Sequence, residues 1–372
     1  MYILRMRIQK ISLENFRNYE KIDLEFDDSS NINLFLGDNA QGKTNFLEAI
    51  TLLSLAKSFR TPDHKSLIGW EKEYSRIKGT ALKSQNELTM EFFIGSLPGQ
   101  RLLKKSLKKN EIPVPVKDFI GEINIVLFHP EDLNMLYLSP SLRRKYLNTI
   151  LSQIDPEYFE SLVNYNRILK QRNKLLALIG EGRAKPIELS SWDQPLAENG
   201  LYIYKKRIEL VKFLNSKLTE YYKKISNSEN NIKVKYQASI DMDEPSAENY
   251  LVLLDLARDT DLRYRQTEKG IHRDDLLFYF DKHHISEFAS RGEMRTLLIA
   301  LKLAEIEYIE SVTREKPVLL LDDVFSELDK SRQNFLLSAI SGFQSFVTAT
   351  HLDFPLDGAK KFNISKGGVI ES

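Results

Sequence analysis

The stretch GDNAQGKT, residues 37–44, constrains the fold of this chain more than any other feature. It fits the pattern G-x-x-x-x-G-K-[S/T], and it follows an apolar segment, NINLFLG at 31–37. From Thr44 to about Lys57 the apolar spacing is helical. Between a strand and a helix, such glycines let backbone N–H groups curl around phosphate oxygens. The flanking strand and helix therefore favour a phosphate-binding loop over a chance glycine turn. The sequence therefore predicts a nucleotide-binding loop in an α/β fold.

The loop predicts a nucleoside triphosphate and Mg²⁺ as ligands, and the family resemblance described below implies that the nucleotide is ATP. Lys43 is expected to reach the β- and γ-phosphates, and Thr44 is expected to ligate Mg²⁺. The nucleotide contacts expected from the loop are Gly37, Asp38, Asn39, Ala40, Gln41, Gly42, Lys43, Thr44 and Asn45.

A second apolar segment, VLLLDD at 318–323, ends in two carboxylates. Alone, it would indicate two solvated aspartates at a strand end. Together with the phosphate-binding loop, it predicts that Asp322 holds Mg²⁺ through its water shell. Asp323 is placed to orient or deprotonate an attacking water. The chain is thus expected to bind and hydrolyse a nucleoside triphosphate.

Three further segments narrow the type of ATPase. ASRGE at 289–293, SELD at 326–329 and TATHLD at 348–353 resemble the signature, D-loop and switch motifs of ABC ATPases. That resemblance implies that Ser290 and Gly292, with Glu293, cap the γ-phosphate held by a second copy. It also assigns Asp329 to nucleotide binding and His351 to catalysis. A compatible alternative is that Ser290 and Glu293 form a helix capping box.

The apolar pattern along the chain predicts an ATPase domain that is split in sequence. Segments 3–13, 20–26, 75–94, 100–115 and 123–128 have strand character, whereas 131–225 is expected to form long helices. Strand signals return at NIKVKYQASI and DDLLFYFD, and the last hundred residues alternate helix and strand. The predicted domains are 1–128 and 266–372 for the ATPase, and 129–265 for a mostly helical lobe.

Composition limits the compartment and the partners. No apolar run approaches the roughly 20 residues needed to span a bilayer, and the start of the chain is interpreted as a strand rather than a signal peptide. The chain has no cysteine, which excludes disulfides and thiolate metal sites and fits a reducing, cytoplasmic location. Because the formal net charge is +1, any nucleic-acid surface must come from a local cluster.

The whole chain resembles the RecF family of bacterial recombination mediators. The segments that carry the resemblance include LENFRNYEKIDLEF, GDNAQGKTNFLEAITLLSLAKSFRT, INIVLFHPEDLNMLYLSPSLRRKYLN, GIHRDDLLF and SRGEMRTLLIALKLAE. Two departures are Leu138 and Ile271, which stand where the family usually has Gly and Pro. None of the departures removes a nucleotide ligand.

The resemblance implies an ABC-type head with a helical lobe, similar to SMC and Rad50 heads but without their long coiled coil. It also implies ATP-dependent homodimerisation, DNA binding and weak, DNA-dependent ATP hydrolysis. The expected role is at single-strand gaps, with RecR and RecO, in loading RecA during repair.

Local clusters of cations are the candidates for DNA contact, with binding dominated by phosphates. They are Arg60, Arg101, Lys104, Lys105, Lys108, Lys109, Arg143, Arg144, Lys205, Lys206 and Arg207. Each cluster alone is also typical of a solvated face. The run His272–Asp275 could indicate a metal site or nuclease, but a hydrogen-bonded element is favoured, and His283 and His284 are expected in a turn.

Three other functions are open. A transporter ATPase is disfavoured by the long helical insert and the missing L-S-G-G-Q. A chromosome-organising head is disfavoured by the missing coiled coil. A nuclease would need an added metal-carboxylate domain. No Q-loop glutamine can be placed.

Overall fold

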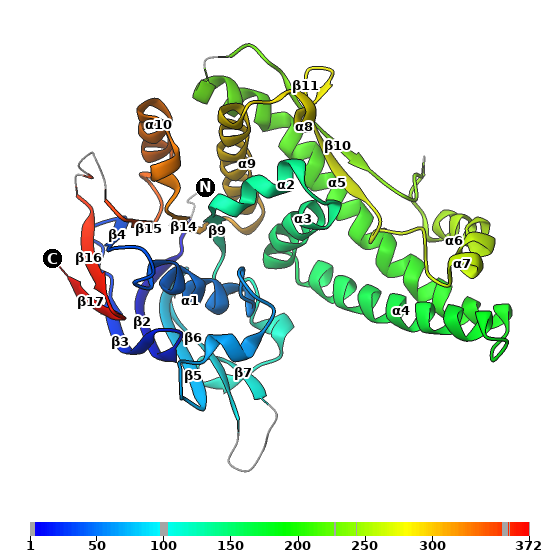
Figure 1. Cartoon of the computed structure of the whole chain (residues 1–372), viewed down its shortest axis with the longest axis horizontal. Coiled ribbons are helices and arrows are strands. Elements are labelled where there is room, and N and C mark those ends of the chain that lie inside the picture. Colours follow the sequence, from blue (N-terminus) through cyan, green and yellow to red (C-terminus); the bar gives the residue numbers. More distant parts are fainter. Residues whose placement is uncertain are drawn as a thin grey trace. The chain divides into compact units, whose positions relative to one another are not determined.

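The computed structural model describes residues 4–96, 103–226, 228–242, 244–351, 356 and 358–371 (Figure 1). They form two compact units, one from Met1–Asp132 and Arg295–Ser372 and the other from Leu133–Met294. The predicted domain boundaries differ from this division chiefly at 266–294. The physical reason is strand pairing, since β11 (Asp275–Phe280) forms its backbone hydrogen bonds with β10 (Ile232–Gln237) of the second unit.

The first unit contains an antiparallel sheet in the order β3-β2-β5-β6-β7-β8. Its strands alternate buried and more exposed residues, as expected for a sheet with one face on a core. The predicted strands are therefore confirmed, with these bounds: β2 Arg7–Phe16, β3 Tyr19–Glu25, β5 Tyr74–Lys83, β6 Asn86–Ser96, β7 Leu103–Lys109 and β8 Ile112–Pro113.

A second sheet has the order β17-β16-β4-β15-β14-β9, and all its neighbours are parallel except the β16–β17 pair. Its central strands are apolar runs because both faces are buried. The carboxyl ends of β4, β14 and β15 meet at one edge, where ligands bind in open α/β sheets. The strands are β4 Ile32–Leu36, β9 Ile125–Phe128, β14 Val318–Asp322, β15 Ser345–Ala349, β16 Lys360–Ser365 and β17 Gly368–Glu371.

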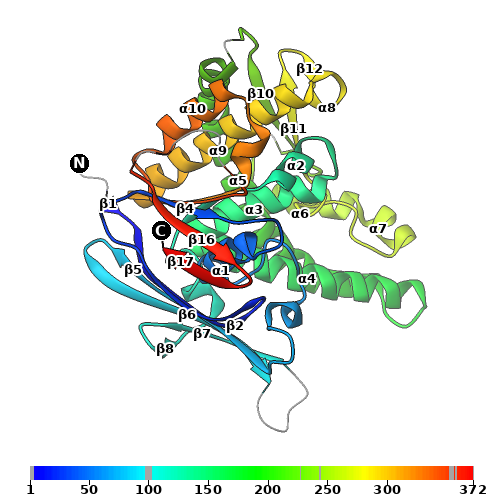
Figure 2. The same ribbon diagram turned by 60° about the vertical axis from the view of Figure 1, so that its left-hand side comes forward.

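Helix α1 (Lys43–Leu55) lies between the two sheets, as Figure 2 shows. It is apolar nearly all round, and Phe46, Leu47, Ile50 and Leu53 are fully buried in the core that both sheets share. Core packing thus holds the first residues of α1 at the sheet edge. Other elements of this unit are β1 (Leu4–Arg5), which pairs with β13 (Glu315–Lys316), and α10 (Lys330–Ile340), which joins β14 to β15.

Further short helices are η1 His64–Leu67, η2 Val116–Asp118, η3 Pro130–Leu133 and η5 Val324–Glu327. The boundary between the units falls within α9 (Arg291–Thr313).

The second unit is mostly helical, as predicted, with a small sheet in the order β10-β11-β12. Its longest helix, α5, has 37 residues and a length of roughly 55 Å. The expectation that His283 and His284 are turn residues is wrong, because they form β12 and pair with the end of β11. The helices are α2 Asn134–Tyr137, α3 Pro140–Ile154, α4 Pro156–Gly180, η4 Pro186–Leu189, α5 Ser190–Ser226, α6 Ala247–Leu256, α7 Arg258–Tyr264 and α8 Ile285–Phe288.

Within the part of the chain that the structure describes, no helix combines the length and the apolar character required to cross a membrane.

Candidate nucleotide-binding site

The glycine loop follows β4 at the carboxyl edge of the parallel sheet, and backbone geometry requires its glycines. A Cβ at Gly37 would lie 2.3 Å from the carbonyl oxygen of Ile364. Gly42 has a φ of 116°, and a Cβ there would meet the side-chain amide of Asn18. The loop therefore takes the tight path that exposes backbone N–H groups to a phosphate.

Lys43 lies inside this loop. Its ammonium group donates to the carbonyl oxygens of Gly37 at 2.6 Å and Asp38 at 2.8 Å. Burial lowers the pKa of Lys43, and the nearby carboxylates of Asp323 and Asp322 oppose that shift. The loop thus holds a cation beside a group of carboxylates, as a phosphate-binding loop does.

Asp322 joins the loop to β14. Its Oδ1 accepts from the Thr44 hydroxyl at 2.9 Å and from the Thr348 hydroxyl at 2.8 Å. The β14–β15 register places Asp322 opposite Thr348, and His129 Nε2 lies 3.5 Å from Asp322 Oδ2. The structure therefore brings together the two residues predicted to bind metal, Thr44 and Asp322, from opposite ends of the chain.

The donor set around Asp322 is one hydroxyl and one carboxylate. Among the described residues, no group of three or more His, Cys, Asp or Glu could hold a metal ion. Mg²⁺ usually keeps several waters and takes one or two protein oxygens together with substrate phosphates. The residues present fit such an ion and do not form an all-protein cage.

Asp323 follows in a left-handed backbone conformation, with φ of 50°. Its backbone N–H donates to the Thr348 hydroxyl at 3.0 Å, which fixes this turn. Partial burial raises the pKa of the Asp323 carboxyl, and the Ser326 hydroxyl and the Lys43 ammonium oppose that shift. A carboxylate with a raised pKa is suited to accept a proton.

Sequence reasoning missed Asn18, Thr348 and His129 at this site. Asn18 lies in the turn between β2 and β3, where its amide donates to Gln41 O at 2.7 Å and accepts from the Asn45 amide at 2.7 Å. The only sequence signal for Asn18 was its place in NFRNY, residues 15–19, which joins two predicted strands. Pairing of distant strands brings all three residues to the site.

Buried Glu48 of α1 supports the loop from the next helical turn. Arg17 donates to both its carboxylate oxygens, at 2.9 and 2.7 Å, and the Ser58 hydroxyl donates at 2.5 Å. Arg60, a predicted DNA contact, donates to Asn45 Oδ1 at 2.6 Å. Arg60 is therefore connected directly to the helix that follows the loop.

The remaining predicted nucleotide contacts in the first unit lie in the glycine loop, at the start of α10 or after β15. Asn39 accepts from the Thr350 hydroxyl at 3.2 Å, and Gln41 accepts from Lys366 N–H at 2.7 Å. Asp329 caps α10 by accepting from Arg332 N–H at 2.9 Å, which lowers the pKa of its carboxyl. Asp38, Ala40 and His351 are exposed.

Ser290, Gly292 and Glu293 belong to the second unit. The Ser290 hydroxyl and backbone N–H both donate to Glu293 at 2.8 Å, and Glu293 N–H donates back at 3.3 Å. The predicted capping box is therefore present at the start of α9. Ser290 is exposed.

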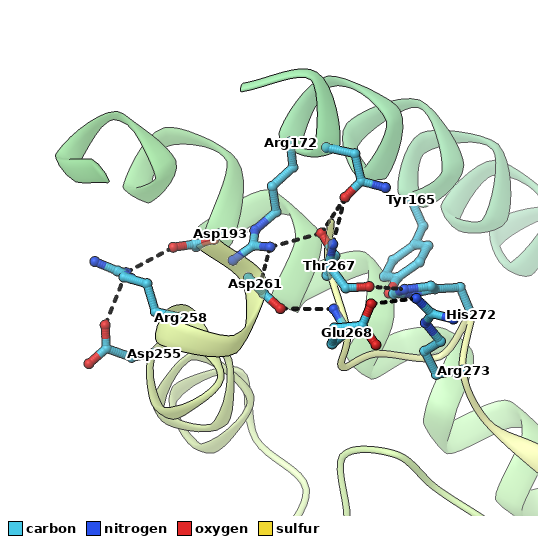
Figure 3. A network of polar contacts seen from close by, with 11 residues as sticks. Tyr165, Arg172, Asp193, Asp255, Arg258, Asp261, Thr267, Glu268, His272 and Arg273 are labelled. Atoms are coloured by element: carbon cyan, nitrogen blue, oxygen red, sulfur yellow. Dashed lines mark hydrogen bonds and ion pairs between the residues drawn. The ribbon is translucent and has the colours of Figure 1, made fainter. Parts of the chain in front are cut away.

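The run His272–Asp275 forms a hydrogen-bonded element inside the second unit. Asp274 accepts from Ser239 N–H at 2.7 Å and from the Tyr236 hydroxyl. His272 contacts the Tyr165 hydroxyl at 2.8 Å and Thr267 O at 2.9 Å (Figure 3). Burial lowers the pKa of His272 to about 4, so the ring is neutral near pH 7.

This element engages three predicted DNA contacts, and the two that are buried, Arg143 and Arg207, require correction. Arg143 is buried and donates to both oxygens of Asp275, at 2.6 and 2.9 Å. Arg144 donates to Asp274 O at 2.8 Å, and Arg207 is buried against Ile271 O at 2.8 Å. Burial of Arg143 and Arg207 argues that they hold the second unit together, in place of DNA contact, whereas DNA contact by the half-exposed Arg144 stays a prediction.

The other predicted cations differ in how they are engaged. Lys108 pairs with Glu91, Lys109 with Glu122 and Lys206 with Asp155. Lys105 donates to Ala56 O at 3.3 Å, whereas Lys104 and Lys205 are exposed and have no partner among the residues described. Arg101, Leu352 and Asp353 lie outside the described residues.

Comparison with known proteins agrees with this geometry. The family model for an AAA ATPase domain matches residues 6–323. The DNA replication and repair protein RecF of Listeria monocytogenes serotype 4b (strain CLIP80459) is 38% identical over 378 residues, covering 99% of this chain and 100% of the relative. RecF of Bacillus cereus (strain G9842) is 38% identical over 375 residues, covering 98% of each chain.

Solved structures match as well. A structure of the recombination mediator RecF with ATP, in the RecFOR pathway, has a TM-score of 0.91 and 36% identity, and it covers 100% of this chain and 99% of that one. An Smc head from Pyrococcus furiosus has a TM-score of 0.55 at 15% identity, covers 99% of this chain and 96% of that one, and shares the fold alone. The predicted α/β, SMC-head-like fold is therefore confirmed, and the chain belongs to the RecF family of DNA replication and repair ATPases.

Proposed function

We propose that this protein binds ATP and Mg²⁺ at the glycine loop and hydrolyses ATP slowly, stimulated by DNA, to switch between monomer and dimer. The observation that carries the proposal is the 2.9 Å hydrogen bond between Thr44 and Asp322 beside Lys43. This arrangement joins the phosphate-binding loop to the metal-binding carboxylate. The solved RecF structure with ATP supports the same ligand.

Each residue of the site has a defined task in this proposal. Lys43 moves from its carbonyl partners to the β- and γ-phosphates, while Thr44 and Asp322 hold Mg²⁺, which neutralises phosphate charge. Asp323 accepts a proton from the water that attacks the γ-phosphorus. The bond from the γ-phosphorus to the bridging oxygen breaks, which releases ADP and phosphate.

The bound nucleotide closes a homodimer in this scheme. Ser290 and Gly292 of one copy cap the γ-phosphate held by the other, where the N-terminus of α9 favours an anion. Glu293, Asp329 and His351 complete the contacts. The exposure of Ser290 supports this role, because a second copy can reach the hydroxyl.

DNA with a single-strand gap is the proposed substrate surface for the dimer, and RecR- and RecO-like proteins are the proposed partners in loading recombinase. The RecFOR pathway named for the matching structure supports this assignment. Nucleoid association follows from DNA binding. We retain the functional division into an ATPase domain and a helical lobe, with boundaries close to those of the two compact units.

Light scattering of the full chain tests this proposal. With a non-hydrolysable ATP analogue, the wild type is expected to dimerise, and with ADP it is expected to stay monomeric. Ser290→Arg should bind the analogue normally yet remain monomeric, because the longer charged side chain blocks the partner's phosphate. Dimerisation of Ser290→Arg to the wild-type extent would remove the sandwich from the proposal.

A further inference from the structure

Strand β10 of the second unit presents two lysines on one face. Ile232 and Val234 are buried, whereas Lys233 and Lys235 are exposed. Successive side chains of a strand point to opposite faces, so the two lysines share the outer face, about 6.6 Å apart along the strand. The sheet therefore has an apolar inner face and a cationic outer face at β10.

Lysines on a terminal strand often serve only to prevent edge-to-edge pairing. Here, helix α5 already covers the free edge of β10 (Figure 1). The Asn215 amide bonds to both Val234 N–H and Val234 O at 2.8 Å, and the Thr219 hydroxyl bonds to Ile232 N–H at 3.0 Å and Ile232 O at 3.1 Å. Edge protection therefore does not account for the two lysines.

The strand register places aromatic rings beside the lysines. Lys233 lies opposite Tyr279 of β11, and Tyr279 lies opposite His284 of β12. The Tyr279 and His284 rings meet edge to face, with centroids 5.4 Å apart, and both side chains are partly exposed. A row of lysine, tyrosine and histidine thus crosses the outer face of the sheet.

The lysines of this face are not engaged within the protein. Neither Lys233 nor Lys235 has a hydrogen-bond or ion-pair partner among the described residues, unlike Lys108, Lys109 and Lys206. The neighbouring carboxylate of Asp281 is bonded to Asn231 at 3.1 Å, and Asp275 is engaged by Arg143. The two ammonium groups are therefore exposed, and no carboxylate among the described residues holds either of them.

We infer that the outer face of the sheet β10-β11-β12, through Lys233, Lys235 and the Tyr279–His284 pair, docks the phosphate backbone of DNA. The inference rests on the proposed function, which supplies DNA as a ligand, and it adds a contact surface that the sequence did not indicate. Free ammonium groups bind phosphate, and flanking rings suit sugars and bases. The rings favour nucleic acid over an acidic protein as the ligand.

The test is the salt dependence of DNA binding by the full chain in the presence of a non-hydrolysable ATP analogue. Fluorescence anisotropy measures binding to a labelled duplex and to a labelled single strand. In Lys233→Gln/Lys235→Gln, the slope of log affinity against log salt is expected to shrink by about 1.8 for the duplex. The same counterion release predicts a loss of duplex affinity on the order of thirty-fold near 0.15 M salt. The single-strand arm shows whether the face also binds unpaired DNA, for which the change of slope is expected to be about 1.4.

The matched control is Lys223→Gln/Lys224→Gln, which removes two charges from the same unit where each lysine already pairs with a glutamate. It should bind DNA like the wild type, and Lys233→Arg/Lys235→Arg should retain binding because the charges remain. Wild-type duplex affinity and slope in Lys233→Gln/Lys235→Gln would overturn the inference alone and leave the face to an acidic protein. Absence of DNA binding by the wild type would overturn the proposed DNA function as well.

Discussion

The phosphate-binding loop of the first unit and a buried arginine cluster of the second unit both gather charged side chains, but they differ in what those charges contact. Lys43 donates to two backbone carbonyls and lies beside carboxylates at a sheet edge. Arg172, which is fully buried, donates to the carboxylates of Asp193 at 2.8 Å and Asp261 at 2.6 Å (Figure 3). The first cation can exchange partners for a phosphate, whereas the second is committed to its two carboxylates.

The difference shows how a ligand-binding site can be distinguished from a charge cluster that only stabilises the fold. Buried ion pairs add little net stability, yet removing one partner is costly because the other charge stays buried. The Arg172 cluster is thus expected to control folding, and the Lys43 loop is expected to control binding. Three substitutions test this contrast, in order of decreasing effect.

Arg172→Met should lower the free energy of unfolding by about 3–5 kcal/mol, because the fully buried Asp261 loses its cation and Asp193 is left with Arg258 alone of its two. Urea denaturation measures the change. The matched control is Arg167→Met on the same helix, where the exposed Arg167 bonds, among the described residues, only to the Asn164 side chain and the expected change is within about 0.5 kcal/mol. Equal stability of the two variants would contradict the structural role of the cluster.

Lys43→Ala should weaken ATP binding by about 3 kcal/mol, in the range of charge-assisted contacts, because it removes the cation expected to face the phosphates. Stability should change little, since the substitution also removes a buried charge whose hydrogen bonds, among the described residues, are only to backbone carbonyls. Calorimetric titration with ATP measures the affinity. Lys57→Ala, an exposed lysine beyond the end of α1, serves as the control. Unchanged ATP affinity in Lys43→Ala would remove this residue from the site.

His272 gives the smallest expected effect and a dependence on pH. Its pKa is about 4 in the folded chain, below the ordinary value of about 6.5, because burial disfavours the charged ring. The unfolded state therefore binds the proton more readily, so stability is full above pH 6.5 and falls as pH drops towards 4, by up to about 3 kcal/mol. Urea midpoints across this window measure the loss.

His272→Gln should flatten this part of the pH profile, because glutamine has no proton to gain between pH 6.5 and 4. Near pH 7, the free energy of unfolding of this variant reports a different effect, because glutamine must replace the hydrogen bonds of His272 to Tyr165 and Thr267. A variant that keeps the wild-type slope between pH 6.5 and 4 would show that another group is responsible.

Local sequence was sufficient for the nucleotide loop. Gly37, Gly42 and Lys43 lie within eight residues, and the flanking apolar patterns specify a strand and a helix. Asp322 was also predictable, because a buried strand that ends in carboxylates can meet the loop only at the carboxyl edge of the sheet. The capping box at Ser290 and Glu293 is equally local, and the structure contains it.

Distant contacts were not predictable from the same patterns. Asn18 and Thr348 reach the site through strand pairing and hairpin geometry. Arg143 and Arg207 lie in basic runs of the kind that contact DNA. In the structure, the Asp275 carboxylate and the Ile271 carbonyl oxygen accept their hydrogen bonds inside the second unit. A side chain's charge does not reveal whether a carboxylate from another segment neutralises it.

The sequence by itself determined the phosphate-binding loop and the strand-end carboxylate of Asp322 that is expected to bind metal, and it indicated a mostly helical middle region. Each depends on residues within one turn or strand, where backbone geometry and apolar period act locally. Only the tertiary structure decided which cations are buried, which are paired and which, like Lys233 and Lys235, face solvent. Strand register and helix packing bring together residues that are far apart in the chain, and no local pattern encodes that register.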